Sequence, residues 1–73
     1  MKTILDLNVG ESGVITKIGV KGALRQHFMD MGITKGTELR VVKIAPLGDP
    51  IEIELRSYNL SIRKADAEQI SVE

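Results

Sequence analysis

The chain has 73 residues and no cysteine, and its ten Lys and Arg residues balance ten Asp and Glu residues. This length allows one domain, residues 1–73, with a thin margin of stability, and the absence of thiols excludes disulfides and thiolate metal sites. Zero formal charge argues against a general nucleic-acid binder and against a polybasic membrane anchor. Because no apolar run approaches the roughly 18 residues of a membrane-spanning helix, we expect a soluble, cytoplasmic protein that is not itself inserted in a membrane.

Short β-branched and apolar segments between glycines predict a mainly β protein. The strands are expected at residues 14–18, 38–45, 51–56, 60–63 and 70–72, and a helical turn at 64–68. Residues 14–18 do not alternate strictly between apolar and polar side chains, which predicts a β-bulge. Residues 51–56 do alternate, so their Ile and Leu side chains should face inward and their charged side chains outward.

One helix is predicted between the first two strands, from Leu24 to Met31. Leu24, Phe28 and Met31 have the i, i+4, i+7 spacing of a buried stripe. Gly32 can take the left-handed position that ends a helix, which places Ile33 where it contacts Phe28 in a Schellman motif.

The start of the helix and the turns have their own sequence signals, and these differ in strength. Gly22 is the only plausible cap at the start of the helix. Gly36 should take the positive φ of a type II turn over residues 34–37. A second turn is expected at Tyr58-Asn59.

Five short strands joined by tight turns must close on each other to bury their apolar faces and hide their edges. The expected architecture is therefore a small SH3-like five-stranded barrel, with one α-helix between the first and second strands. A five-stranded barrel of OB type is the competing architecture.

His27, the only histidine, is the one weak candidate for a metal ligand. On a helix of 3.6 residues per turn, His27 and Met29 point to opposite sides, so they cannot share an ion. A pair with Asp30 or Met31 would supply two ligands, whereas a metal site needs three or four. We expect His27 to pair with Asp30 at the surface and predict no metal site and no cofactor.

Three exposed positions are predicted to contact a partner protein: Arg25, Met29 and Leu47. Arg25 and Met29 share the outward face of the helix, where a methionine is an adaptable apolar contact. Leu47 lies at the tip of the loop Pro46–Pro50, whose two prolines limit its freedom before binding. Asp49, in the same loop, is expected to form the turn.

Catalytic constellations are not apparent in this sequence. The serines have one histidine to serve them all, and no G-x-S-x-G, Walker A or G-x-G-x-x-G motif is present. Glu52 and Glu54 fit a solvated strand face with alternating charges. We therefore expect a binding module that is not an enzyme.

Four motifs in order resemble the FeoA family over nearly the whole chain. Their residues are Leu7, Gly10, Gly13 and Ile15; Leu24, Arg25, Phe28, Asp30, Met31, Gly32, Ile33, Gly36, Thr37 and Leu39; Pro46 to Ile51; and Leu60, Ile62, Arg63, Ala67, Ile70 and Val72. Two positions depart from the family pattern: Lys35, where proline is frequent, and Phe28, where leucine is frequent.

The resemblance implies an SH3-like barrel that acts as a small cytosolic partner of FeoB, the membrane transporter of ferrous iron with a GTP-binding domain. It implies a location at the inner face of the cell membrane through that partner. It implies neither catalysis nor nucleic-acid binding, and it assigns no metal ligands and no oligomeric state.

Two alternatives remain open. Small barrels also bind RNA, although the only aromatic side chains, Phe28 and Tyr58, offer little for stacking on bases. A weak metal sensor built on His27 is the other alternative.

Overall fold

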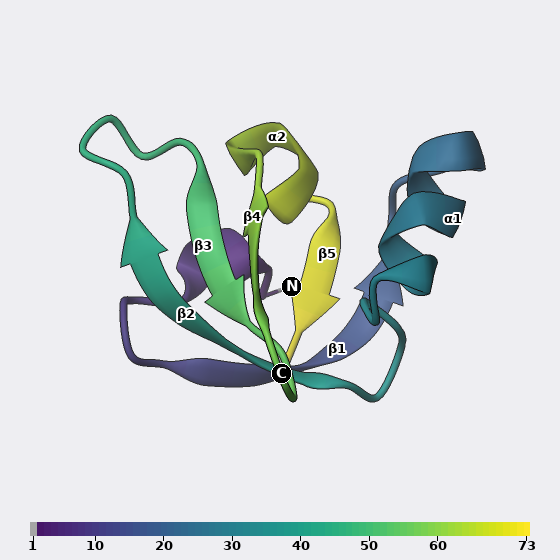
Figure 1. Ribbon diagram of the computed structural model, residues 1–73, viewed down its shortest axis with the longest axis horizontal. Helices are drawn as coiled ribbons and strands as arrows, with labels where there is room; N and C mark the ends of the chain where they lie inside the picture. Colours follow the sequence, from purple (N-terminus) through teal and green to yellow (C-terminus); the bar gives the residue numbers. More distant parts are fainter. Residues whose placement is uncertain (1) are drawn as a thin grey trace.

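Of the predicted domain, the computed structural model describes residues 2–73, which form a bent antiparallel sheet with one exposed helix (Figure 1). The elements in chain order are η1 (Ile4–Asp6, a 3₁₀ helix), β1 (Ser12–Ile18), α1 (Gly22–Asp30), β2 (Glu38–Ile44), β3 (Ile51–Glu54), β4 (Asn59–Ile62), α2 (Lys64–Ala67) and β5 (Ile70–Val72). The strands follow the order β4-β3-β2-β1-β5. The sequence prediction of five strands with the main helix after the first is confirmed.

Strand β1 belongs to both halves of the sheet. Its residues 12–14 pair with β2, and its residues 15–18 pair with β5. A bulge lies between Ile15 and Lys17, where the irregular alternation predicts one. Because a bulge bends a strand and increases its twist, β1 can curve from one half of the sheet into the other and enclose an apolar interior.

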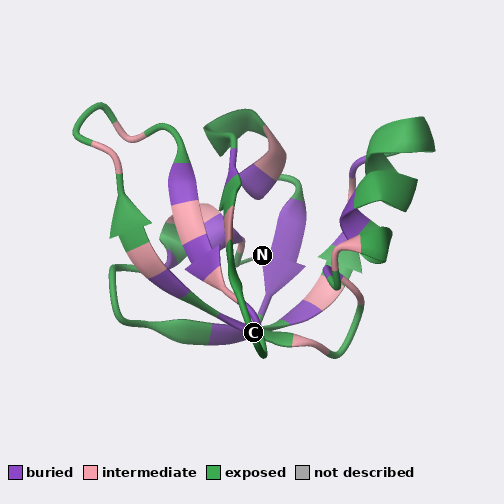
Figure 2. Ribbon diagram, viewed as in Figure 1, coloured by how far each residue is buried: buried purple, intermediate pink, exposed green. Residues whose placement is uncertain are grey.

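Every strand of the sheet carries buried residues (purple in Figure 2), and the core that they form is apolar except for Ser71. The largest fully buried side chains are Ile4, Ile15, Ile33, Leu39, Val41, Ile53 and Ile70. Full burial of one such side chain contributes about 1.5–3 kcal/mol, so a domain of this size depends on most of them. The predicted alternation of β3 is confirmed, since its isoleucines are buried and its glutamates are half-buried.

Helix α1 ends as the sequence predicts. The Ile33 N–H donates to the Phe28 carbonyl at 2.9 Å, and the Gly32 N–H donates to the Met29 carbonyl at 3.1 Å. These two bonds define a Schellman motif, with Gly32 at a φ of 95° and Phe28 and Ile33 both buried. The turn that follows also forms, with Gly36 at a φ of 91°.

Several predicted boundaries were wrong. Helix α1 begins at Gly22 and has Lys21 as its N-cap, because Gly22 adopts a φ of 67° and lets the extended chain enter the helix there. The turn between β3 and β4 is made by Arg56-Ser57, since the Leu55 N–H donates to the Tyr58 carbonyl at 2.9 Å. The helix η1 was not predicted.

Replacing Gly32 with alanine should lower the free energy of unfolding by about 1–2 kcal/mol, because a Cβ is strained at positive φ. Gly32→Asn should cost less, since asparagine tolerates the left-handed region better than alanine does. Urea unfolding followed by circular dichroism measures both variants. Equal stability of Gly32→Ala and the wild type would contradict this account of the helix end.

Candidate functional site

Helix α1 lies at the edge of the molecule and presents most of its surface to solvent (Figure 2). Phe28 is its one buried side chain, and Met31, just after the helix, packs against the core. Leu24 was predicted to be buried with them, but 38% of it is exposed. The prediction was wrong because Phe28 is the one side chain of the helix that reaches the core, and Leu24, one turn earlier, is left at the surface.

Arg25 and Met29 lie one turn apart on the exposed part of α1. The Arg25 Nη1 donates to the Ile18 carbonyl at 2.8 Å, which ties the helix to the end of β1. Met29 is 39% exposed. Both side chains border a hollow of about 350 Å³ between the helix and β1. The residues that line it are Thr16, Lys17, Ile18, Arg25, Met29 and Lys35.

Two lysines complete this hollow, and the sequence prediction of the site missed both. Lys17 follows the bulge in β1, and Lys35 is brought beside that strand because the Gly36 N–H donates to the Ile15 carbonyl at 2.7 Å. The position of Lys35, immediately before the glycine of the predicted turn, was the available signal. The hollow is therefore lined by three cationic side chains, including Arg25, and by no carboxylate.

His27 is exposed, and the predicted pair between His27 and Asp30 does not form. The Asp30 Oδ1 instead accepts a hydrogen bond from the Gln26 Nε2 at 2.9 Å, an i, i+4 contact along the helix. The His27 ring lies 6.5 Å from the Phe28 ring, measured between centroids. Among residues 2–73, no three His, Asp or Glu side chains gather in a group that could hold a metal ion.

Leu47 is 93% exposed at the tip of the loop between β2 and β3, as predicted. The Gly48 N–H donates to the Ala45 carbonyl at 2.7 Å, and the Ala45 N–H donates to the Pro50 carbonyl at 3.1 Å. These bonds close the loop beneath Leu47 and hold its side chain outward.

Asp49 has a role that the sequence did not reveal. Its Oδ1 accepts a hydrogen bond from the Lys64 N–H at 3.0 Å, so the loop is fastened to the first turn of α2. Arg63, the N-cap of α2, has no side-chain acceptor for the N–H groups of the first turn. The Lys64 N–H therefore needs an acceptor from another part of the chain. The chain supplies that acceptor from Asp49, fifteen residues earlier.

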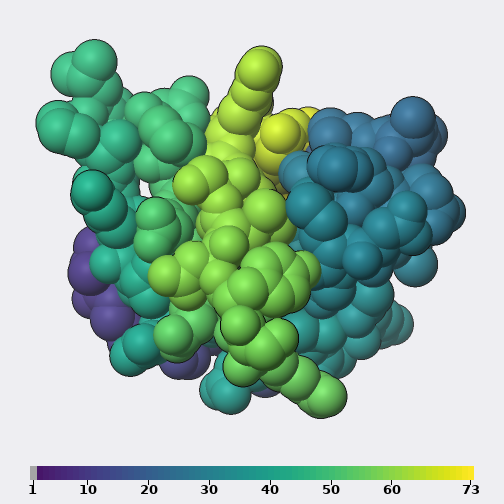
Figure 3. All heavy atoms as spheres, viewed as in Figure 1, coloured from purple at the N-terminus to yellow at the C-terminus, as the bar shows by residue number. Residues whose placement is uncertain are grey.

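The predicted contact residues fall into two separate places. Helix α1, with Arg25 and Met29, stands on the right of the molecule in Figures 1 and 3, and the loop that carries Leu47 projects at the upper left. The sheet lies between them. A single small contact patch therefore cannot include all three residues.

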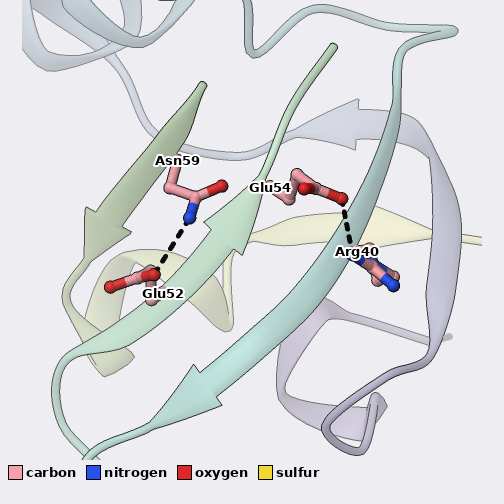
Figure 4. Close-up of polar contacts among 4 residues, drawn as sticks. All are labelled: Arg40, Glu52, Glu54 and Asn59. Carbon is pink, nitrogen blue, oxygen red and sulfur yellow. Dashed lines mark hydrogen bonds and ion pairs between the residues drawn. The ribbon is translucent and has the colours of Figure 1, made fainter. Parts of the chain in front are cut away.

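Charged side chains of β2 and β3 and polar side chains of β4 lie on the outer face of the sheet, as predicted for Glu52 and Glu54. The Arg40 Nη2 lies 2.8 Å from the Glu54 Oε1, and the Asn59 Nδ2 donates to the Glu52 Oε2 at 3.2 Å (Figure 4). Arg40 and Glu54 are directly opposed in neighbouring strands. These half-exposed contacts add a few tenths of a kcal/mol each and fix the register rather than form a reactive pair.

None of the helices within residues 2–73 is long and apolar enough to cross a membrane. The fold and these surfaces define a small SH3-like domain whose distinctive features are a cationic hollow beside an exposed helix and a projecting apolar loop tip.

Comparison with known proteins identifies the family. The FeoA domain model matches residues 2–73. A fusion of Fe(2+) transport protein A with the Fe(2+) transporter FeoB, from Porphyromonas gingivalis, is 37% identical over 68 residues; the match covers 93% of this chain and 8% of that protein. The chain belongs to the FeoA family, whose members are small proteins associated with ferrous iron transport.

Solved structures confirm the fold. The solution structure of FeoA from Chlorobium tepidum superimposes with a TM-score of 0.92 at 35% identity, and the match covers 97% of this chain and 68% of that one. FeoA from Stenotrophomonas maltophilia, described as an SH3 domain protein in complex with zinc, gives a TM-score of 0.83 at 22% identity over 100% of this chain and 91% of that one. The SH3-like architecture is thus confirmed over the OB type.

Removing the Arg25 guanidinium should destabilise the chain by about 0.5–1.5 kcal/mol, because its hydrogen bond to the Ile18 carbonyl is lost. Met29→Ala, one turn further along the same face, is the matched control and should change stability by less than about 0.5 kcal/mol. Urea unfolding of Arg25→Ala, Arg25→Lys and Met29→Ala makes the comparison. An Arg25→Ala variant as stable as the wild type would show that this tie is unimportant.

Because His27 has no second ligand beside it, His27→Ala should bind zinc and ferrous ions as the wild type does. Isothermal titration under anaerobic conditions measures this. A micromolar site that disappears in His27→Ala would overturn the prediction.

Proposed function

We propose that this chain is an accessory protein of ferrous iron uptake that docks on a FeoB-type transporter from the cytoplasm and assembles or modulates it. The observation that carries the proposal is the Porphyromonas gingivalis relative, in which a sequence similar to this chain is fused to FeoB. Fusion of two domains raises the effective concentration of one for the other, so it is typical of domains that work together. This chain spans 8% of that relative, so the transport step itself belongs to the partner.

The surfaces of the domain support a role in binding rather than in catalysis. Its core is apolar except for Ser71, and its hollows are open depressions at the surface. Leu47 is an apolar side chain held almost fully in solvent, and Met29 adds a second exposed apolar contact. Burial of such side chains against a partner would remove apolar surface from water, which is the role that the proposal assigns to them.

We assign the two contact points to different parts of the partner. Because the loop that carries Leu47 and the α1 surface lie at opposite edges of the molecule (Figures 1 and 3), we expect a partner to reach them with two separate segments. The hydrogen bonds beneath Leu47 and the Asp49 tie to α2 keep the loop in one shape before binding, which reduces the entropy lost on docking.

Co-purification with the FeoB-type transporter from the same organism tests the proposal. The wild-type chain should bind the transporter, and its deletion should slow growth when ferrous iron is limiting. Leu47→Ser should bind at least about tenfold more weakly with unchanged stability, because a buried interface leucine contributes more than 1 kcal/mol.

Val9→Ser is the matched control for Leu47, since Val9 is 57% exposed and lies outside both contact points. Its affinity for the transporter should equal that of the wild type. Normal ferrous iron uptake without this chain, together with no measurable binding, would refute the proposed function.

A further inference from the structure

The hollow between α1 and β1 gathers positively charged side chains, although the net charge of the whole chain is zero. Residues 17–35 carry four Lys or Arg residues and one Asp, whereas the rest of the chain carries six Lys or Arg and nine Asp or Glu. The molecule is therefore electrically polarised, and its cationic end is the segment that forms α1 and its flanking turns. Charge segregation of this kind steers an oppositely charged partner to one face.

The cations of the hollow are not neutralised by the protein itself. Within the described part of the chain, Lys17, Arg25 and Lys35 make no ion pair, and the one hydrogen bond that Arg25 makes is to the Ile18 carbonyl. That bond uses one N–H of the Arg25 Nη1 and leaves the other N–H groups of the guanidinium available to a ligand. Asp30, the only acidic residue of the segment, is engaged by Gln26.

The hollow also has an apolar part. Met29 is 39% exposed and lines it together with Thr16 and Ile18. A volume of about 350 Å³ holds a few side chains and is too small for a folded domain. A ligand with two or more carboxylates and an aliphatic side chain between them would complement these lining residues.

From this arrangement we infer that the hollow between α1 and β1 binds an acidic segment of a partner protein, with carboxylates on Lys17, Arg25 and Lys35 and an aliphatic side chain on Met29. The inference rests on the proposed function in taking the transporter as the protein that supplies this segment. A nucleic acid fits less well, because the acidic remainder of the surface repels a long polyanion and no exposed aromatic ring borders the hollow.

The first experiment tests the hollow without the transporter. The ¹⁵N-labelled chain is titrated with the peptide acetyl-Glu-Glu-Leu-Glu-Glu-amide, and with the corresponding Gln peptide as control. Amide shifts should change at residues 16–18, 25–29 and 35–36 with the Glu peptide alone. Shifts elsewhere, or equal shifts with both peptides, would overturn the inference.

The second experiment uses charge reversal against the transporter purified in detergent. Lys17→Glu/Lys35→Glu should weaken binding at least about tenfold, as expected when charge complementarity is inverted. Lys2→Glu/Arg56→Glu changes the net charge equally at exposed sites outside the hollow and outside the Leu47 loop, and should bind as the wild type does. If Lys17→Glu/Lys35→Glu does not fold, Lys17→Gln/Lys35→Gln replaces it and should weaken both peptide and transporter binding.

The outcomes separate the two claims. Equal transporter affinity of both charge-reversed variants would overturn the inference and leave the proposed function standing. The Glu peptide could bind the hollow while the wild-type chain does not bind the transporter. That result would refute the proposed function and support the acidic-segment site. Displacement of the Glu peptide by polyuridylate RNA at 150 mM salt would identify a nucleic-acid site and overturn the inference.

Discussion

Phe28 is the one side chain of helix α1 that enters the core, and the place of the helix depends on it. Directly after the helix, the hydrogen bond from the Ile33 N–H to the Phe28 carbonyl turns the chain back, and fully buried Ile33 pins it to the sheet. Arg25 makes the third attachment, to the end of β1. Because Phe28 is the one buried side chain of α1, the rest of the helix stays exposed, and a hollow remains open between the helix and β1. The surface assigned to the partner is thus a direct result of how little of the helix is buried.

The fold was predictable because its signals are local. Gly32, Ile33 and Phe28 have the spacing of a Schellman motif, and the alternation in residues 51–56 shows which side of β3 is buried; both follow from backbone geometry alone. The errors concern contacts between distant segments. Leu24 has helical spacing with Phe28, yet it is 38% exposed, and spacing alone carries no information about how deeply a helix is buried against the rest of the fold.

The site was predictable only in part for the same reason. Arg25, Met29 and Leu47 were expected at the surface, and they are there. Their grouping was not available from the sequence, since the loop that carries Leu47 lies at the opposite edge of the molecule from α1 (Figure 1). Lys17 and Lys35 come to line the same hollow only once β1 and the turn at Gly36 are hydrogen-bonded. Zero net charge hid the polarisation of the molecule. The net charge is a sum over the whole chain, whereas binding depends on where the fold places the individual charges.

The central claim is that the exposed α1 face and its cationic hollow are where this domain meets a FeoB-type transporter. Amide hydrogen exchange of the chain, alone and bound to the purified transporter, tests it most directly. The account predicts slower exchange in the bound state at residues 16–18, 25–30 and 34–36. Protection confined to β3 and β4, with exchange in α1 unchanged, would contradict it.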